Sequence, residues 1–441
     1  MAVADLRLDE VLDKARKVAQ QAEVFHLSGW NEPVIFEANR LKILERRDSS
    51  GIALRLIKDG RIGFSSTTHW NGADTLVENA LETVPFGPEA KMEFSDRREF
   101  TPVPVYDPAV EAHPLEGMMQ LGQALIDGVR SGESELLCDA NISRDVSTIT
   151  LLNSRGGYAR YTKSVFSAYI GGTLIKGTDM LFLGEGKTSC QPITDPSPLV
   201  DAVLTQLEYG RDIASPASGE MAVVFTPRGV SGALLAPLMA GFNGKSVLQG
   251  SSPLIEKLGE QLLDERFSLW DDPSLAMIPG SRMCDDEGVP AERMPLIDKG
   301  VISNFLYDLQ TAGQAGTKST GNSHRGLNSL PSPGVSVSLV SEGDTSFEEM
   351  ISDIKDGIVV ERLLGAGQSN ILGGDFNANV LLGYRIEKGR ITGRLKNTVI
   401  NGNVYTVLKN FQALGNDATW MGGSLKTPSI YCTNVSVATR D

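Results

Sequence analysis

Gly232-Ala-Leu-Leu-Ala-Pro-Leu-Met-Ala-Gly241 is the stretch from which the organisation of this chain is best understood. Its apolar spacing continues a predicted helix over residues 230–239, which follows a predicted strand over 221–226. Three turn-rich motifs come later, in the order Asp285-Asp-Glu-Gly-Val-Pro290, Pro295-Leu-Ile-Asp-Lys-Gly-Val-Ile302 and Gly321-Asn-Ser-His-Arg325. The helical stretch holds no side chain that could ligate a metal or activate water, so it carries no hydrolytic chemistry of its own.

The remainder of the second half is predicted to be rich in strands. Residues 297–302 and 386–391 each place a charged turn with a glycine between two short strands. Glycine supplies the positive φ that such tight turns need. Short helices are predicted over 347–354 and 403–414, the second packed against the sheet.

The first half mixes helices with antiparallel strands. Asp59-Gly60 between two apolar runs is a strong hairpin signal. The turn over residues 153–157 separates two further strands that alternate like a pair. Helices are predicted over 6–22, 71–84, 115–129 and 199–211, and strands over 23–28, 34–36, 41–68, 136–152 and 158–170.

Two polar, proline-containing segments follow this region, at residues 194–198 and 214–219. The second is taken as the domain boundary, which predicts an N-terminal domain over 1–214 and a C-terminal domain over 215–441. The predicted fold class is α+β, with an N-terminal domain of helices and antiparallel hairpins and a strand-rich C-terminal domain that also carries helices.

Composition describes an ordinary globular protein with an acidic surface. The net charge of -14 repels phosphate backbones, so nucleic-acid binding is not expected. The four cysteines are far apart and form no C-x-x-C pair, which predicts buried free thiols in a reducing compartment. The N-terminus does not resemble a signal peptide, and no apolar run is long enough to span a membrane. A cytoplasmic location is therefore expected.

The order and spacing of these motifs resemble the TldD/PmbA (TldD/TldE) family of zinc-dependent peptidases. The resemblance is strongest over residues 221–425 and includes Gly374-Asp-Phe-Asn377, Gly383-Tyr-Arg-Ile-Glu-Lys-Gly389 and Asn401-Gly-Asn403. In the first half it rests on Asp48-Ser-Ser-Gly-Ile-Ala-Leu-Arg55 and Asp59-Gly-Arg-Ile-Gly-Phe64. Each motif alone is weak, but their shared order over nearly the whole chain is specific. The resemblance implies an α/β N-terminal domain, a β-barrel-like C-terminal domain, and a dimer whose inner cavity takes an extended peptide.

The resemblance also identifies a degenerate metal site. TldD-type members carry His-Glu-x-x-x-His on the helix at 232–241, and the matching positions here are Ala236, Pro237 and Gly241. A later cysteine serves those members as a third ligand, and Gly422 stands at its position. Neither ligand nor general base remains, so no cofactor is expected in this chain, and zinc is expected in a TldD-type partner.

No other hydrolytic arrangement is evident in the sequence. None of the four histidines precedes a glutamate, and no two lie within about forty residues. Ser323-His324 is a poor dyad, because neighbours in a strand point to opposite faces. Asp285-Asp286-Glu287 is interpreted as a structural turn near the cleft. Gly186-Lys187-Thr188 fails the P-loop pattern, since Leu181 stands where that motif needs glycine, and it is interpreted as a turn.

Three functional hypotheses follow. The first is a non-catalytic TldE/PmbA-like subunit of a metallopeptidase complex acting on peptides or unfolded segments. The second is a stand-alone homodimeric peptide-binding or modulator protein without hydrolase activity. The third is a peptidase with a rebuilt active site. Asn322, His324 and Arg325 are the predicted substrate-binding residues, although for His324 a hydrogen bond within its loop is the favoured interpretation and contact with a substrate or partner comes second. The expected partners are a TldD-type zinc subunit or a second copy, together with a peptide substrate.

Overall fold

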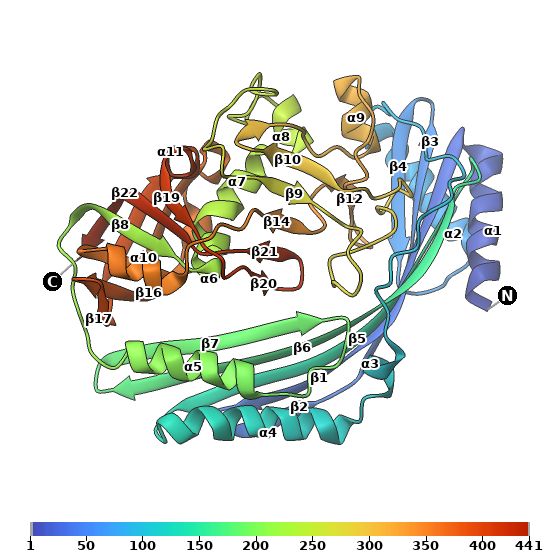
Figure 1. The fold of residues 1–441 in the computed structure, drawn as a ribbon. Helices are drawn as coiled ribbons and strands as arrows, with labels where there is room; N and C mark the ends of the chain where they lie inside the picture. Colours follow the sequence, from blue (N-terminus) through green and yellow to red (C-terminus); the bar gives the residue numbers. More distant parts are fainter. Residues whose placement is uncertain (1–2, 440–441) are drawn as a thin grey trace.

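The chain, a computed structural model, is described over residues 3–439, with side chains from Arg7 onward. A long twisted sheet forms the amino-terminal half, and a barrel with a second sheet forms the C-terminal half, which lies over one face of the long sheet (Figure 1). This mixed, strand-rich architecture confirms the predicted α+β class. Within the described residues, no helix is both long and apolar enough to cross a membrane.

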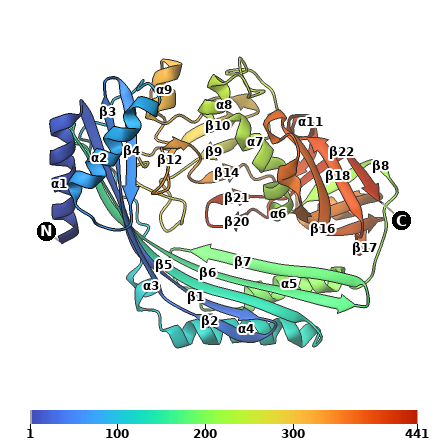
Figure 2. The same ribbon diagram turned by 180° about the vertical axis from the view of Figure 1, so that it is seen from behind.

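Antiparallel pairs alone build the seven-stranded amino-terminal sheet. Strands β1, β5 and β6 contain 17, 17 and 19 residues, so they run the length of the molecule and curve beneath the C-terminal half (Figure 2). The order is β4-β3-β1-β5-β6-β7, with β2 added to β1. The strands are β1 (Gln21–Glu37), β2 (Arg40–Leu44), β3 (Arg47–Lys58), β4 (Arg61–Thr67), β5 (Leu137–Asn153), β6 (Tyr158–Lys176) and β7 (Asp179–Ser189).

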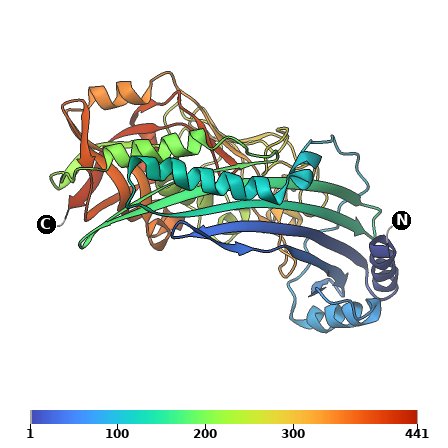
Figure 3. The ribbon, with the colours of Figure 1, turned by 90° about the horizontal axis from the view of Figure 1, so that it is seen from below.

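Helices cover the sheet on its outer face and at its amino-terminal end. Helices α4 (Leu115–Gly132) and α5 (Ser197–Tyr209) lie side by side across the outer face (Figure 3). Because side chains alternate along β6, Phe166 and Ile170 bury against these helices, while Tyr161 and Lys163 face the C-terminal half. The remaining helices of this half are α1 (Val3–Val18), α2 (Ala73–Thr83), η1 (Val84–Phe86) and α3 (Pro108–Ala112).

A closed five-stranded barrel lies in the C-terminal half, as predicted. Its ring β15-β8-β22-β18-β16 closes because β15 also pairs with β16. Strand β17 (Arg390–Arg394) extends one edge, and β19 (Phe411–Leu414) pairs with β22. The barrel strands are β8 (Gly219–Phe225), β15 (Asp356–Leu364), β16 (Asp375–Glu387), β18 (Thr398–Asn403) and β22 (Ile430–Thr439).

A second, six-stranded sheet in the order β11-β10-β9-β14-β21-β20 packs beside the barrel. Its strands are β9 (Leu269–Asp271), β10 (Met294–Asp298), β11 (Val301–Ile302), β14 (Ser338–Val340), β20 (Thr419–Met421) and β21 (Leu425–Thr427); β12 (Ser323–His324) and β13 (Ser332–Pro333) pair separately. The helices of this half are α6 (Pro227–Val230), η2 (Ser231–Leu235), α7 (Ala236–Gly241), α8 (Gly244–Leu248), α9 (Leu309–Ala315), α10 (Phe347–Asp353), η3 (Ala366–Gln368), η4 (Ile371–Gly373) and α11 (Val404–Lys409).

The two halves share one hydrophobic core. Val359 and Ile386 of the barrel bury in the same cluster as Val203 and Leu207 of α5 and Phe166 of β6. The edge of the long sheet that carries β7 is therefore held at a fixed distance from the barrel.

Three hairpins confirm the turn prediction and share one backbone geometry. The turn residue pairs Asp59-Gly60, Lys299-Gly300 and Lys388-Gly389 all have positive φ, between 48° and 78°. Positive φ at both central residues is the geometry of the two-residue turn that matches the twist of paired strands. The four cysteines are buried and free, also as predicted.

Four sequence interpretations were wrong. The predicted helix 6–22 ends at Val18, because β1 begins at Gln21 and pairs with β3 from its first residue. The predicted strands 23–28 and 34–36 are one continuous strand, β1, because both of its edges are paired. The predicted helix 403–414 ends at Lys409, since Phe411–Leu414 instead pairs with β22. Gly186-Lys187-Thr188 lies within β7 and is not a turn. Glycine is needed in this strand because a Cβ at Gly184 would come within 2.6 Å of the Tyr169 hydroxyl.

Candidate functional site

The stretch 232–241 forms an irregular helix that packs against the barrel in one buried hydrophobic cluster. A π-helical turn over Ser231–Leu235 joins α6 to α7, and Pro237 lies in the first turn of α7. Proline removes one backbone donor and clashes with the turn before it, so a widened turn on its amino-terminal side accommodates the ring.

The four positions that stand where the zinc-site residues would be form two pairs in the structure. Ala236 and Gly422 line the same cavity, of about 490 Å³. Pro237 and Gly241 are buried on the other side of α7 and do not line it. A Cβ at Gly241 would lie 2.5 Å from the Tyr405 hydroxyl and 3.1 Å from Leu254.

The family's zinc does not fit this arrangement. Ala236 and Gly422 offer no donor atom to the cavity, and the place of the second histidine is filled by the Tyr405 side chain. Across residues 7–439, whose side chains are described, no three His, Cys, Asp or Glu side chains are grouped so as to hold a metal ion. We therefore derive no chemical step through zinc in this chain.

A second cavity, of about 580 Å³, adjoins the first and shares Gly186, Arg228 and Met421 with it. It lies between α5, the edge strand β7 and the barrel. We call the two adjoining cavities the edge cleft. The second cavity is mainly apolar, through Leu199, Phe347 and Trp420 among others.

One open sheet edge borders the edge cleft, because among residues 3–439 β7 pairs with β6 alone. The side chain of Gln206 bonds the outward N–H and C=O of Gly184, at 2.9 and 3.2 Å. By the two-residue period of a strand, Gly186 and Thr188 also direct their N–H and C=O groups to this edge. The Gly186 N–H donates to the neighbouring carboxylate of Glu185, at 2.9 Å. This edge can accept another strand.

Two carboxylates and one guanidinium lie at the junction of the two cavities. Arg228 donates a short hydrogen bond to Glu185 of β7, and its Nε is 3.8 Å from a carboxylate oxygen of Glu361 on β15. Burial raises the pKa of Glu361, against the opposing effects of Arg228 and a hydrogen bond from Thr226.

Asn322 and Arg325, predicted to contact substrate, are buried in internal networks. Asn322 is 2% exposed and donates to Asp271 at 2.5 Å. Arg325 donates to Glu23 at 2.8 Å and stacks on Phe25, 4.1 Å from its ring centroid. Neither residue lines the edge cleft. Substrate contact by these residues stays a prediction.

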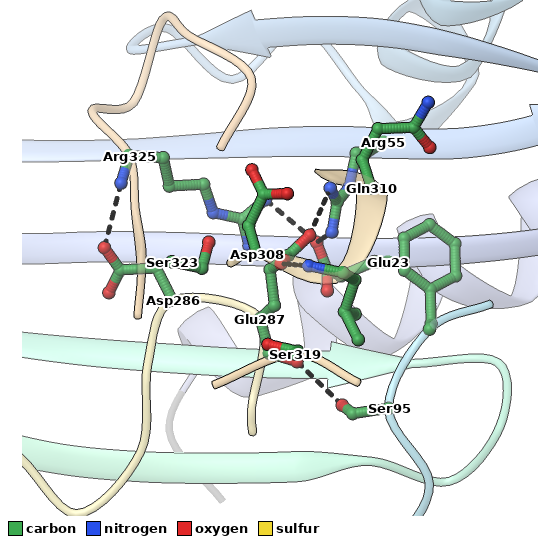
Figure 4. Close-up of polar contacts among 12 residues, drawn as sticks. Glu23, Arg55, Ser95, Asp286, Glu287, Asp308, Gln310, Ser319, Ser323 and Arg325 are labelled. Atoms are coloured by element: carbon green, nitrogen blue, oxygen red, sulfur yellow. Dashed lines mark hydrogen bonds and ion pairs between the residues drawn. The ribbon is translucent and has the colours of Figure 1, made fainter. Parts of the chain in front are cut away.

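Arg325 belongs to a buried ion network that joins the long sheet to the C-terminal half (Figure 4). Arg55 on β3 pairs with Glu23 at 2.9 Å and with Glu287 at 2.6 Å, and the side chains of all three are at most 2% exposed. Burial raises the pKa of Glu287 to about 7, while Arg55 opposes this shift. This network fixes the position of the 285–290 turn against the sheet.

The acidic triplet is thus structural, as the sequence interpretation held. Asp285 accepts N–H groups from Glu287 and Val289, both at 2.9 Å. Asp286 accepts the N–H of Arg325 at 3.0 Å, and Glu287 pairs with Arg55. The three carboxylates point to separate partners, so they do not converge on one ion.

His324 is held as a neutral imidazole. Its Nε2 lies 2.9 Å from a guanidinium nitrogen of Arg282, which can only donate. Burial and, next, Arg282 lower the pKa of His324 to about 4; Lys163 acts in the same direction, and Asp286 opposes them.

We expect this lowered pKa to make the fold acid-sensitive at His324. As pH falls from about 6.5 to about 4, the unfolded chain takes up this proton before the folded one, so stability is lost over that window. His324→Gln keeps an acceptor for Arg282 without titrating. Urea unfolding at pH 7 and pH 4 should show the wild type losing about 2 kcal/mol more than His324→Gln. Equal losses in the two proteins would contradict this assignment.

Sequence reasoning missed Glu185, Arg228, Glu361 and Tyr384. They come from β7, α6, β15 and β16, and the topology alone brings them together. One signal was present: Glu361 directly follows the apolar run Ile358 to Val360 in the strand Asp356–Leu364, and that run is fully buried. A charge in such a run points to a partner or a cleft.

Comparison with known proteins agrees with this architecture. Residues 218–439 match the family model described as the PmbA/TldA metallopeptidase C-terminal domain, and residues 22–84 match PmbA/TldA metallopeptidase domain 1. The chain is 24% identical to an uncharacterized protein of Methanocaldococcus jannaschii over 430 residues, covering 96% of this chain and 98% of that protein. It is 31% identical over 195 residues to metalloprotease PmbA of Escherichia coli O157:H7, covering 44% and 41% of the two chains.

A similar solved structure is that of TldE from Thermococcus kodakarensis, with a TM-score of 0.89 at 22% identity, covering 98% of this chain and all of that one. At this identity the likeness establishes a shared fold. Since the C-terminal family model alone spans half of the sequence, the chain belongs to the PmbA/TldD family of metallopeptidase-like proteins.

Proposed function

We propose that this chain is the non-catalytic, TldE/PmbA-type subunit of a two-component metallopeptidase that acts on peptides or unfolded segments. One observation carries the proposal: an open sheet edge borders a cleft that has no donor atoms at Ala236 and Gly422, where zinc peptidases of this family need them. The hydrolytic zinc then belongs to a TldD-type partner. On this proposal the chain is cytoplasmic and divides functionally at residues 214/215.

The peptide binds as an added strand along β7. Main-chain pairing gives affinity with little demand on sequence, as unfolded substrates require. Gly186 and Thr188 supply the edge groups, since their N–H and C=O groups point away from β6. Substrate contact by Asn322, His324 and Arg325 is part of this proposal, with a hydrogen bond within its loop as the other role of His324.

A second candidate is a homodimeric peptide-binding protein without a catalytic partner, for which the same cleft would serve. A peptidase with a rebuilt site is less well supported, because the carboxylates at the junction are already paired with Arg228. Co-purification from the native cell separates the first two, since a His-Glu-x-x-x-His protein accompanies the chain under the first alone.

Strand addition is tested by removing one edge donor. Gly186→Pro deletes the outward N–H, and we expect it to weaken binding of an unfolded, fluorescently labelled polypeptide at least about tenfold. Gly186→Ala is the matched control: it keeps the N–H, and its Cβ would meet the Tyr169 ring at a tolerable 3.2 Å. Equal affinity of the two variants, measured by fluorescence anisotropy, would rule out pairing at this edge.

A further inference from the structure

Two buried polar atoms at the junction of the edge cleft lack a hydrogen-bond partner among the described residues. They are the Tyr384 hydroxyl and Arg228 Nε. Tyr384 is 3% exposed, lines the larger cavity, and packs edge-on against Tyr209 with ring centroids 5.4 Å apart. An unsatisfied buried hydroxyl is costly, so such a group in a cavity wall indicates a ligand atom that completes it.

Two carboxylates face each other at this junction. Glu185 and Glu361 both lie against the guanidinium of Arg228, which bonds Glu185 closely and stands 3.8 Å from Glu361, and Arg362 adds a weaker favourable interaction with Glu361. Lys187 and Asp417 also line the cavity, and Asp417 already accepts the N–H and hydroxyl of Ser429, at 2.8 and 2.6 Å. Glu361, whose contact with Arg228 is longer than that of Glu185, is thus the less compensated of the two, and burial raises its pKa. A cationic ligand group would compensate it.

Beyond these polar groups the cavity is apolar. Leu199, Ala202 and Tyr209 of the α5 side face Phe347 and Trp420 of the C-terminal half. A ligand that fits must therefore carry a positive charge next to a group that is buried among apolar side chains.

We propose that the larger cavity binds the amino-terminal residue of the peptide. The ammonium group is a hydrogen-bond donor to Glu361 and Tyr384, the first carbonyl oxygen accepts from Arg228 Nε, and an apolar first side chain occupies the space beside α5. The peptide then runs along β7 toward the cavity at Ala236 and Gly422. This inference rests on the proposed peptide-binding function. It adds the direction in which the peptide is bound, because the chain recognises a free amino terminus.

The test compares binding of three heptapeptide amides to the full-length chain by calorimetry. The first is lysine-free, begins with leucine and has a free amino terminus; the second is its N-acetylated form; the third is acetylated and contains an internal lysine. We expect the free amino form to bind at least about tenfold more tightly than either acetylated peptide. Glu361→Gln should abolish most of this preference by weakening the binding of the free amino form.

Two further variants keep the test independent of folding defects. Tyr384→Phe retains the ring that packs on Tyr209 and removes an unpartnered hydroxyl, so it should fold and reduce the preference about threefold or more. Glu220→Gln, an exposed position on β8, should leave the preference intact. Equal affinity for free and acetylated peptides, or tight binding of the acetylated lysine peptide, would overturn the amino-terminal assignment while leaving peptide binding in place. Failure of all three peptides to bind would overturn the proposed function as well.

Discussion

Replacing Arg55 with methionine is expected to lower the free energy of unfolding by about 3–5 kcal/mol, one of the two largest effects expected here. The variant removes the shared partner of Glu23 and Glu287, whose side chains are fully buried. Glu23 keeps Arg325, but Glu287 keeps only the N–H of Leu309, at 2.8 Å. The buried Glu287 carboxylate must then take up a proton or remain charged without a cationic partner, and either state lowers the stability of the fold.

Chemical denaturation of Arg55→Met measures this loss. The matched control is Arg47→Met on the same strand, because Arg47 pairs with Glu45 while both side chains are more than half exposed, at 61% and 53%. Exposed pairs contribute about 0–1 kcal/mol, so the control should unfold nearly like the wild type. If both variants lost the same small amount, the buried network would not be what joins the sheet to the 285–290 turn.

Restoring the family's zinc-site residues is expected to fail, with a comparably large effect on stability. Ala236→His, Pro237→Glu, Gly241→His and Gly422→Cys together supply the residue types, yet we expect no stoichiometric zinc and a loss of about 3 kcal/mol. The loss comes mainly from Gly241, where even a Cβ would lie 2.5 Å from the Tyr405 hydroxyl. The wild type should likewise purify without stoichiometric zinc.

Two alanine variants isolate that cause. Gly241→Ala should be strongly destabilised, whereas Gly232→Ala, in the same irregular helix, has no neighbour nearer than 3.9 Å to its new Cβ and should be neutral or slightly stabilised. Tight binding of one zinc per chain by the fourfold variant, with wild-type stability, would show that the site is intact apart from its ligands.

The sequence predicted those parts of the fold that local chemistry determines. Asp59-Gly60 and Lys388-Gly389 specify turns by backbone geometry alone, and each hairpin formed where expected. The failures have tertiary causes. Phe411–Leu414 has apolar residues that suit a helix, but the free edge of β22 recruits it as a strand. Gly186 resembles a turn residue in sequence, yet the position of Tyr169 on the neighbouring strand explains the glycines of β7.

The site was predictable only in part, for a similar reason. Family spacing located Ala236 and Gly422 in the sequence, and folding brings both to one cavity. Spacing could not reveal that Gly241 packs against Tyr405, or that Arg325 forms a buried ion pair with Glu23. Glu361 and Tyr384 come from strands whose pairing is set by closure of the barrel, so no local pattern joins them to Arg228.

The central claim is that this chain binds substrate while a partner supplies the chemistry. The most direct measurement is the rate of cleavage of an unfolded polypeptide by the purified chain, compared with the rate for the complex recovered when the tagged chain is isolated from its native cell. We expect no cleavage by the chain alone, and chelator-sensitive cleavage by a complex that contains a His-Glu-x-x-x-His subunit. Chelator-sensitive cleavage by the chain alone, at a rate matching the complex, would contradict the account.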